Sequence, residues 1–136
     1  MRQAVFILMF GLLFSSCKKS SPSPISANDG TYVGEVSIDP MPNYITQETF
    51  EVKALSYTKI KILFQNGRLV AEADLKGNAF TIIPTNYRVN DGQNETQSVI
   101  TGEGSFSNNT MTIRWHEEYN AKPNSYSEYK GTLTKF

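Results

Sequence analysis

The chain's one histidine stands in a run of residues whose types could carry chemistry. His116 lies between Trp115 and Glu117, and Glu118 follows. On a β-strand, His116 and Glu118 project from one face, and Trp115 and Glu117 from the opposite face. His116 with Glu118 would supply two metal ligands, or a general base with a carboxylate that orients it. A metal site normally has three or four ligands, and no spaced partners are evident, so we predict a solvent-facing strand edge and no metal site.

Other catalytic signatures are not found in the sequence. None of the serines stands in a Gly-x-Ser-x-Gly elbow. Gly102-Glu103-Gly104 is a close glycine pair, but it has neither the third glycine nor the helix of a nucleotide-binding fingerprint. We expect these glycines to let a strand bend sharply or a large side chain pack over it. The sequence therefore predicts no catalytic residue and no cofactor.

Composition narrows the classes of protein further. The 136 residues allow one domain, and 13 basic residues balance 13 acidic ones, which argues against a nucleic-acid binder. The single cysteine, Cys17, can form neither an intramolecular disulfide nor a cysteine-rich zinc site.

Residues 1–16 have the three regions of a secretory signal peptide. Arg2 gives a positive start, an apolar stretch runs from Ala4 to Phe14, and two serines follow. The apolar stretch is shorter than the roughly 20 residues of a membrane-spanning helix. We therefore predict that this segment directs export.

The residues before Cys17, Phe14-Ser15-Ser16, resemble the lipobox of bacterial lipoproteins, which usually has leucine where Phe14 stands. The resemblance implies cleavage before Cys17 and a diacylglycerol on its thiol, so Cys17 is the predicted lipid attachment site; a plain cleaved signal is the alternative. Acyl chains would tether the protein to the membrane without spanning it. Lys18-Lys19 stands where aspartate marks inner-membrane retention in that family. The resemblance thus implies the outer membrane, on its periplasmic face, with the cell surface as the alternative.

Residues 17–28 are rich in serine and proline and form a predicted semi-extended tether that cannot bury a core. The predicted domain is residues 29–136. Without Arg2, Lys18 and Lys19 it keeps 10 of the 13 basic residues and all 13 acidic ones, so the domain is mildly acidic.

From Thr31 onward the apolar residues alternate with polar ones, which is typical of half-buried strands. Asn66-Gly67, Gly77-Asn78 and Ser107-Asn108-Asn109 mark turns, and Pro40, Pro42 and Pro84 are read as strand ends. Residues 68–76 also have helical composition, but turns flank them tightly, so we predict a strand. The pattern predicts an all-β fold, a single antiparallel meander of about eight strands that forms a barrel, a half-open barrel or a sandwich.

The first and last predicted strands carry Gly30-Thr31-Tyr32 and Gly131-Thr132-Leu133. This arrangement resembles lipocalin-type barrels, and the whole chain resembles small lipocalin-like lipoproteins of Gram-negative bacteria. Tyr32 takes the general position where lipocalins usually have tryptophan. The resemblance implies a barrel, and it transfers no ligand-binding residue.

Two features bear on binding. The predicted inward set is bulky (Phe50, Phe64, Phe80, Phe106, Met111, Ile113 and Trp115), but it also contains small residues (Gly34, Ala54, Ala71, Ala73, Gly102 and Gly104). The interior is therefore either filled or able to hold one small ligand. Five tyrosines near loops and strand ends either pack within the sheet or form a binding cluster at one rim (Tyr44, Tyr87, Tyr119, Tyr126 and Tyr129).

We therefore predict a membrane-anchored, non-enzymatic module of the cell envelope that binds a small apolar ligand or an envelope protein. The alternative is a structural or inhibitor lipoprotein that acts through a rim loop around Asn90–Asn94. A hydrolase that uses His116 with Glu118 is the least favoured hypothesis.

Overall fold

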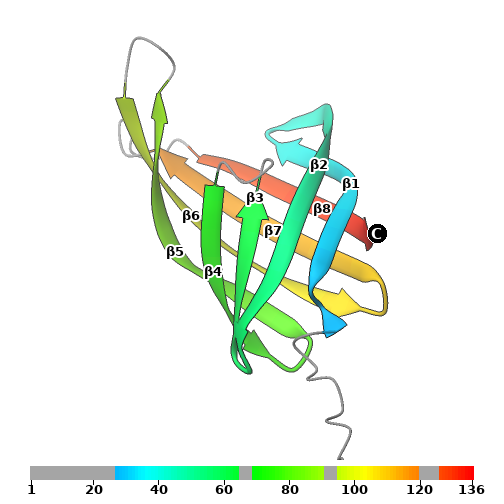
Figure 1. The fold of residues 1–136 in the computed structure, drawn as a ribbon. Coiled ribbons are helices and arrows are strands. Elements are labelled where there is room, and N and C mark those ends of the chain that lie inside the picture. The colour runs from blue at the N-terminus through cyan, green and yellow to red at the C-terminus, as the bar shows by residue number, and fades with distance from the viewer. Residues whose placement is uncertain (1–26, 65–68, 91–94, 120–125) are drawn as a thin grey trace, which may run out of the picture.

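The structure is a computed structural model that describes residues 27–64, 69–90, 95–119 and 126–136. Figure 1 shows the strands wrapped around one axis. Their bounds are β1 Gly30–Asp39, β2 Met41–Ser56, β3 Lys59–Phe64, β4 Leu69–Lys76, β5 Ala79–Asn90, β6 Glu95–Ser107, β7 Thr110–Tyr119 and β8 Tyr126–Lys135. Cys17, the predicted signal peptide and nearly all of the predicted tether lie outside the described residues. In the described part of the chain, no helix is long and apolar enough to cross a membrane.

The strands form a closed barrel in sequence order, and every neighbouring pair is antiparallel. Closure is made by β1 and β8, where Val36 pairs with Gly131. The predicted all-β meander of eight strands is confirmed, and the barrel is closed rather than half-open. Residues 69–76 form strand β4 with strictly alternating burial, as predicted.

Two strands run further than the proline positions predicted. Strand β2 begins at Met41, directly after the turn at Pro40, and runs through Pro42. Strand β5 passes through Pro84 and continues to Asn90, with an irregularity in its pairing to β6 between Ile82 and Thr85. Because a bulge leaves residues out of the ladder, it accommodates a proline that has no N–H to donate. Reading Pro42 and Pro84 as strand ends was wrong.

The barrel interior is an apolar core to which all eight strands contribute. The bulky residues predicted to point inward are all buried, at 4% exposure or less (Phe50, Phe64, Phe80, Phe106, Met111, Ile113 and Trp115). Phe50, Phe64 and Trp115 meet edge-to-face at the centre, with ring centroids 5.0–5.5 Å apart. Edge-to-face contact is one of the arrangements that the quadrupoles of aromatic rings favour.

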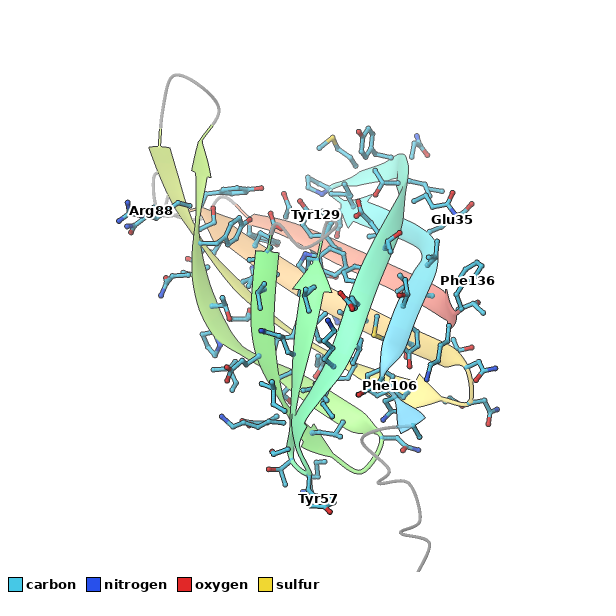
Figure 2. All side chains as sticks on the ribbon, viewed as in Figure 1. Glu35, Tyr57, Arg88, Phe106, Tyr129 and Phe136 are labelled. Atoms are coloured by element: carbon cyan, nitrogen blue, oxygen red, sulfur yellow. The ribbon has the colours of Figure 1, made fainter. Side chains whose placement is uncertain are left out.

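One end of the barrel, which we call the closed end, is sealed by the start of the described chain. The Tyr32 hydroxyl donates a hydrogen bond of 2.9 Å to the carbonyl of Asn28, and both residues are buried. The ring of Tyr32 packs on Phe106. The tight turns of β2–β3, β4–β5 and β6–β7 lie at this end, where Figure 2 labels Tyr57 and Phe106. The chain therefore enters the barrel at its closed end.

The two glycines of the Gly102-Glu103-Gly104 run have the predicted packing role. A Cβ on Gly104 would lie 2.3 Å from Phe80 Cζ and 2.4 Å from the carbonyl oxygen of Thr112. A Cβ on Gly102 would lie 2.4 Å from the carbonyl oxygen of Arg114. Only the missing side chains let Phe80 and strand β7 approach so closely.

Candidate functional site

The structure places His116 and Glu118 on the outer face of β7, as the alternation predicted. The His116 ring stacks on Tyr126 of β8 with centroids 4.5 Å apart, and Glu118 is exposed. Within the described residues, no three histidine, cysteine or acidic side chains are grouped to hold a metal ion. The pair therefore belongs to the outer face of the barrel, with His116 half-buried and Glu118 exposed, and β7 is not an edge because it pairs with both β6 and β8.

The neighbouring carboxylate, Glu117, lies inside the barrel. Burial alternates strictly along β7, and Glu117 follows Trp115 on the inward face with 6% of its surface exposed. Its Oε2 accepts hydrogen bonds of 3.3 Å from the hydroxyls of Tyr119 and Tyr129. Burying a carboxylate is costly unless hydrogen bonds compensate for the lost water. The two tyrosine hydroxyls provide this compensation for Glu117.

Three tyrosines from three strands gather around this carboxylate. Tyr129 of β8 stacks flat on Trp115, with centroids 4.6 Å apart and an interplanar angle of 2°. Burial, followed by the negative charge of Glu117, raises the pKa of Tyr87 and of Tyr129 well above the ordinary value of 10.0. These two hydroxyls therefore stay protonated at neutral pH and serve as donors beside Glu117.

A buried serine completes the group. Ser98 of β6 pairs with both Tyr87 of β5 and Tyr119 of β7, which places its side chain on the inward face. Its Oγ has no exposed surface and no hydrogen-bond partner. A buried hydroxyl without a partner is uncommon in folded proteins. We call Glu117, Ser98, Tyr87, Tyr119 and Tyr129 the Glu117 cluster.

The Glu117 cluster lies toward the end of the barrel opposite the closed end, which we call the polar end. Here β5 and β7 end, and β6 and β8 begin. Figure 2 shows Tyr129 toward this end, away from Tyr57 and Phe106. The three tyrosines are only partly buried, whereas Tyr32 and Phe106 at the closed end are fully covered. The cluster is thus the polar part of the interior, and it lies next to solvent.

A separate set of charges lies on the outer face of β7 and β8. Arg114 donates a 2.8 Å hydrogen bond to Oε2 of Glu128. The ammonium nitrogen of Lys130 lies 2.8 Å from Oε1 of the same carboxylate and forms an ion pair with it, without the angles of a hydrogen bond. The guanidinium of Arg114 and the ammonium of Lys130 lower the pKa of Glu128 to about 2. These three charges satisfy one another, which is what a structural surface network does.

Two hollows also lie on the outside of the barrel, with volumes of about 820 and 500 Å³. Both are lined by Thr81, Glu103 and Arg114, whose side chains point away from the core. The larger hollow is lined by residues of β1, β2 and β5–β8 and the smaller by residues of β5–β8, and both are open to solvent. Their charged residues are already paired in part, so the Glu117 cluster is the better candidate site.

The sequence prediction identified part of this cluster. Tyr87, Tyr119 and Tyr129 were among the five tyrosines considered for a rim cluster, and they do come together. Tyr44 and Tyr126 do not join them, and both are exposed, at 56% and 53%. Glu117 and Ser98 were not recognised. The signal for Glu117 was its position two residues after Trp115, on the face predicted to be buried.

The cluster has the chemistry of a binding site. A buried carboxylate accepts hydrogen bonds and attracts positive charge, and aromatic rings supply apolar contact area. Concave sites with mostly apolar walls and a few placed polar groups are typical of small-molecule binding. The group contains neither a nucleophile paired with a base nor a histidine.

Comparison with known proteins supports the fold. No family model matches the chain, and no curated protein matches it. Among solved structures, that of EF1p2_mFAP2b bound to DFHBI is similar, with a TM-score of 0.54 and 14% sequence identity. The alignment covers 85% of this chain and 100% of that chain. At this identity the likeness shows a shared β-barrel fold.

Proposed function

We propose that this chain is a lipid-anchored, non-enzymatic binding module of the bacterial cell envelope, and that it holds a small, largely apolar ligand at the polar end of its barrel. The observation that carries the proposal is the Glu117 cluster: a carboxylate with 6% exposure, surrounded by tyrosines, inside a closed barrel. The similar barrel fold of a protein solved with DFHBI bound supports ligand binding by a barrel of this kind.

The anchor is inferred from the sequence, and the direction of the chain determines which end of the barrel it would hold. The predicted tether precedes β1, which begins at the closed end beside Asn28. A lipid on Cys17 would therefore hold the closed end toward the membrane and leave the polar end facing away. Mass spectrometry of the mature N-terminus tests this: a diacylglycerol-modified Cys17 is expected, and an unmodified Cys17 would refute the anchor.

Ligand binding is tested with an apolar probe and the protein's own reporter. Trp115 is the single tryptophan of the chain and stacks on Tyr129, so a ligand at the polar end should shift its emission. We expect 4-phenylbutan-1-ol to bind the full chain in dodecyl maltoside micelles saturably, beyond a blank of empty micelles. Tyr129→Ala should weaken this binding at least 5-fold.

The matched control is Tyr126→Ala, on the same strand but on the outer face. It should leave affinity for the alcohol within 2-fold of the wild type. Equal losses in both variants, or no saturable binding to the wild type, would refute the ligand proposal.

A second candidate is contact with an envelope protein. The start of β2, at the polar end, exposes Met41, Tyr44 and Ile45 at 56%, 56% and 58%. Exposed apolar and aromatic residues of this kind are typical of protein interfaces. In-cell crosslinking from position 45 distinguishes the two functions, since a ligand-only barrel gives no discrete crosslinked partner. Of the rim loop predicted at Asn90–Asn94, Asn90 ends strand β5, and residues 91–94 lie outside the described part of the chain.

A further inference from the structure

Two tight turns lie side by side at the closed end of the barrel. We call them together the tip, which consists of residues 55–59 around the β2–β3 turn and residues 76–79 around the β4–β5 turn. The backbone N–H of Leu75 donates a 2.8 Å hydrogen bond to the carbonyl of Thr58, which joins the two turns. Figure 2 shows Tyr57 at the outermost point of this end.

The tip carries apolar side chains that the fold leaves in solvent. Tyr57 is 79% exposed and Leu55 is 48% exposed. Leu55 lies at an irregularity in the β2–β3 ladder, between Ala54, which packs against the core, and Ser56. Such a bulge re-aims a side chain, and here it leaves Leu55 outside the core. Because turns are built mainly from Gly, Pro, Asn, Asp and Ser, a tyrosine next to an exposed leucine indicates a contact surface.

The charges nearest the end of the barrel are those of lysines. Lys59 and Lys76 belong to the tip, and Lys76 lies beyond Asp74, which is level with Lys59 in the β3–β4 ladder. Glu72, which pairs with Lys59 at 3.9 Å, lies further from the end. A lysine can lay its apolar stem on a nonpolar surface while its ammonium group reaches a polar layer. This arrangement suits a surface of anionic lipid headgroups.

The chain enters the barrel at this same end. Lys135 Nζ donates a 2.7 Å hydrogen bond to the carbonyl of Ala27, the first described residue. Residues 18–26 separate Ala27 from Cys17, the proposed lipid attachment site. Since a chain spans at most about 3.6 Å per residue, a lipid on Cys17 would lie within about 35 Å of Ala27. Such a short connection makes contact between the barrel and the bilayer intramolecular, so that even a weak contact is populated.

We propose that the tip binds the lipid bilayer, with Leu55 and Tyr57 in the interfacial layer and the tip's lysines at the headgroups. This inference rests on the anchor of the proposed function and extends it from a tether to an oriented contact. Tyrosine is enriched at membrane–water interfaces, where its ring contacts lipid and its hydroxyl stays in water. The polar end then faces away from the membrane, where a ligand or an envelope protein has access.

The position of the anchor favours lipid over a protein as the partner of the tip. A protein bound there would have to fit between the barrel and the bilayer, within the reach of residues 18–26. Two exposed apolar side chains are also few for a stable protein interface, which buries about 800 Å² on each partner. They suffice for a surface that an acyl chain already holds at the membrane.

The test uses tryptophan reporters and brominated lipid, which quenches tryptophan on contact. The protein is purified from the membranes of a Gram-negative host, where Cys17 can be processed, and reconstituted into vesicles of phosphatidylcholine and phosphatidylglycerol with or without bromine on the acyl chains. Leu55→Trp and Tyr57→Trp each place a reporter in the tip. After subtraction of the wild-type signal of Trp115, the single and buried tryptophan, bromination should reduce reporter emission roughly 3-fold.

Two matched controls place the same reporter at exposed positions away from the tip. Tyr44→Trp lies at the polar end, and Val70→Trp lies on the outer face of β4. Bromination should leave the emission of both reporters nearly unchanged. Equal quenching at all four positions, or stronger quenching at position 44 than at position 57, would overturn the proposal.

Mass spectrometry of the same preparation separates this inference from the proposed anchor. If Cys17 carries a diacylglycerol and neither tip reporter is quenched, bilayer binding by the tip is overturned while the anchor stands. If both tip reporters are quenched in protein with an unmodified Cys17, the contact stands and the anchor is refuted. The two tip variants are independent, so one decides the question even if the other does not fold.

Discussion

The packing of Phe80 over Gly104 makes a quantitative prediction about the closed half of the barrel. A methyl group on Gly104 would lie 2.3 Å from Phe80 Cζ and 2.4 Å from the carbonyl oxygen of Thr112. Ordinary contacts are longer by more than 1 Å, so the ring would have to move. It has little room, since Phe80 is 2% exposed and packs on Phe106 at 5.1 Å.

Overpacking a well-filled core costs about 1–3 kcal/mol. Gly104→Ala belongs at the upper end, about 3 kcal/mol, because one of the clashing atoms belongs to the β7 backbone and cannot rotate away. For a domain of this size each kcal/mol lowers Tm by about 4–8 °C. We therefore expect a Tm loss of about 12–24 °C, measured by thermal unfolding followed through Trp115 fluorescence.

A double-mutant cycle separates the two clashes. Phe80→Leu removes the ring atoms that a methyl group on Gly104 would meet, so the two substitutions together should cost about 1–2 kcal/mol less than their sum. Gly102→Ala is the matched control, because its closest contacts are backbone atoms of Arg114 and Trp115. Phe80→Leu should not rescue it. A Gly104→Ala protein within 1 kcal/mol of the wild type, or equal coupling at both glycines, would refute the reasoning.

Three further substitutions test the polar groups. Ser98→Ala removes a buried hydroxyl without a partner, so chemical denaturation should show a gain of about 1 kcal/mol in unfolding free energy, and a loss would contradict the structure. Tyr129→Phe removes a donor to the buried carboxylate and should cost about 1.5 kcal/mol in the same assay, with Tyr126→Phe within 0.5 kcal/mol of the wild type as the control. Arg114→Gln should raise the pKa of Glu128 from about 2 toward its ordinary 4.5, as read by an NMR titration, because the guanidinium favours the charged carboxylate. A lowered pKa stabilises the fold above about pH 4.5, and this stabilisation is lost as the pH falls toward 2. The variant should therefore begin acid unfolding at a higher pH, and an unchanged pKa would contradict the ion pair.

The fold was predictable because alternation is unbroken over most of the chain. In β4 and β7 every second residue is buried, so the inward set could be read directly from the sequence. The turn signals at Gly77-Asn78 and Asn108-Asn109 agree with the observed hairpins. Closure of the barrel could not be read in this way, because it depends on the pairing of β1 with β8 across nearly the whole domain.

The site was harder to predict from the sequence than the fold, and the reason lies in strand β5. Phe80 and Ile82 point inward. If the alternation continued without a break, the later even-numbered residues of β5 would also point inward. The bulge between Ile82 and Thr85 changes the parity, so that Tyr87 pairs with Ser98 and points inward instead. No sequence pattern signals that change beyond Pro84, which was taken for the end of the strand. The meeting of Tyr87 with Glu117 therefore required the structure.

The two halves of the barrel differ in what their interiors can do. In the closed half, the ring of Phe80 fills the space above Gly104 and the Tyr32 hydroxyl bonds to Asn28, so little is left for a ligand to satisfy. In the polar half, the carboxylate of Glu117 is buried among tyrosine hydroxyls, and the hydroxyl of Ser98 is buried without a hydrogen-bond partner. Hydrophobic residues at both positions would avoid the free-energy cost of removing polar groups from water. Packing alone therefore does not explain why a carboxylate and a hydroxyl are buried here. The closed half is therefore an apolar core, and the polar half holds the buried polar groups on which the proposed ligand binding rests.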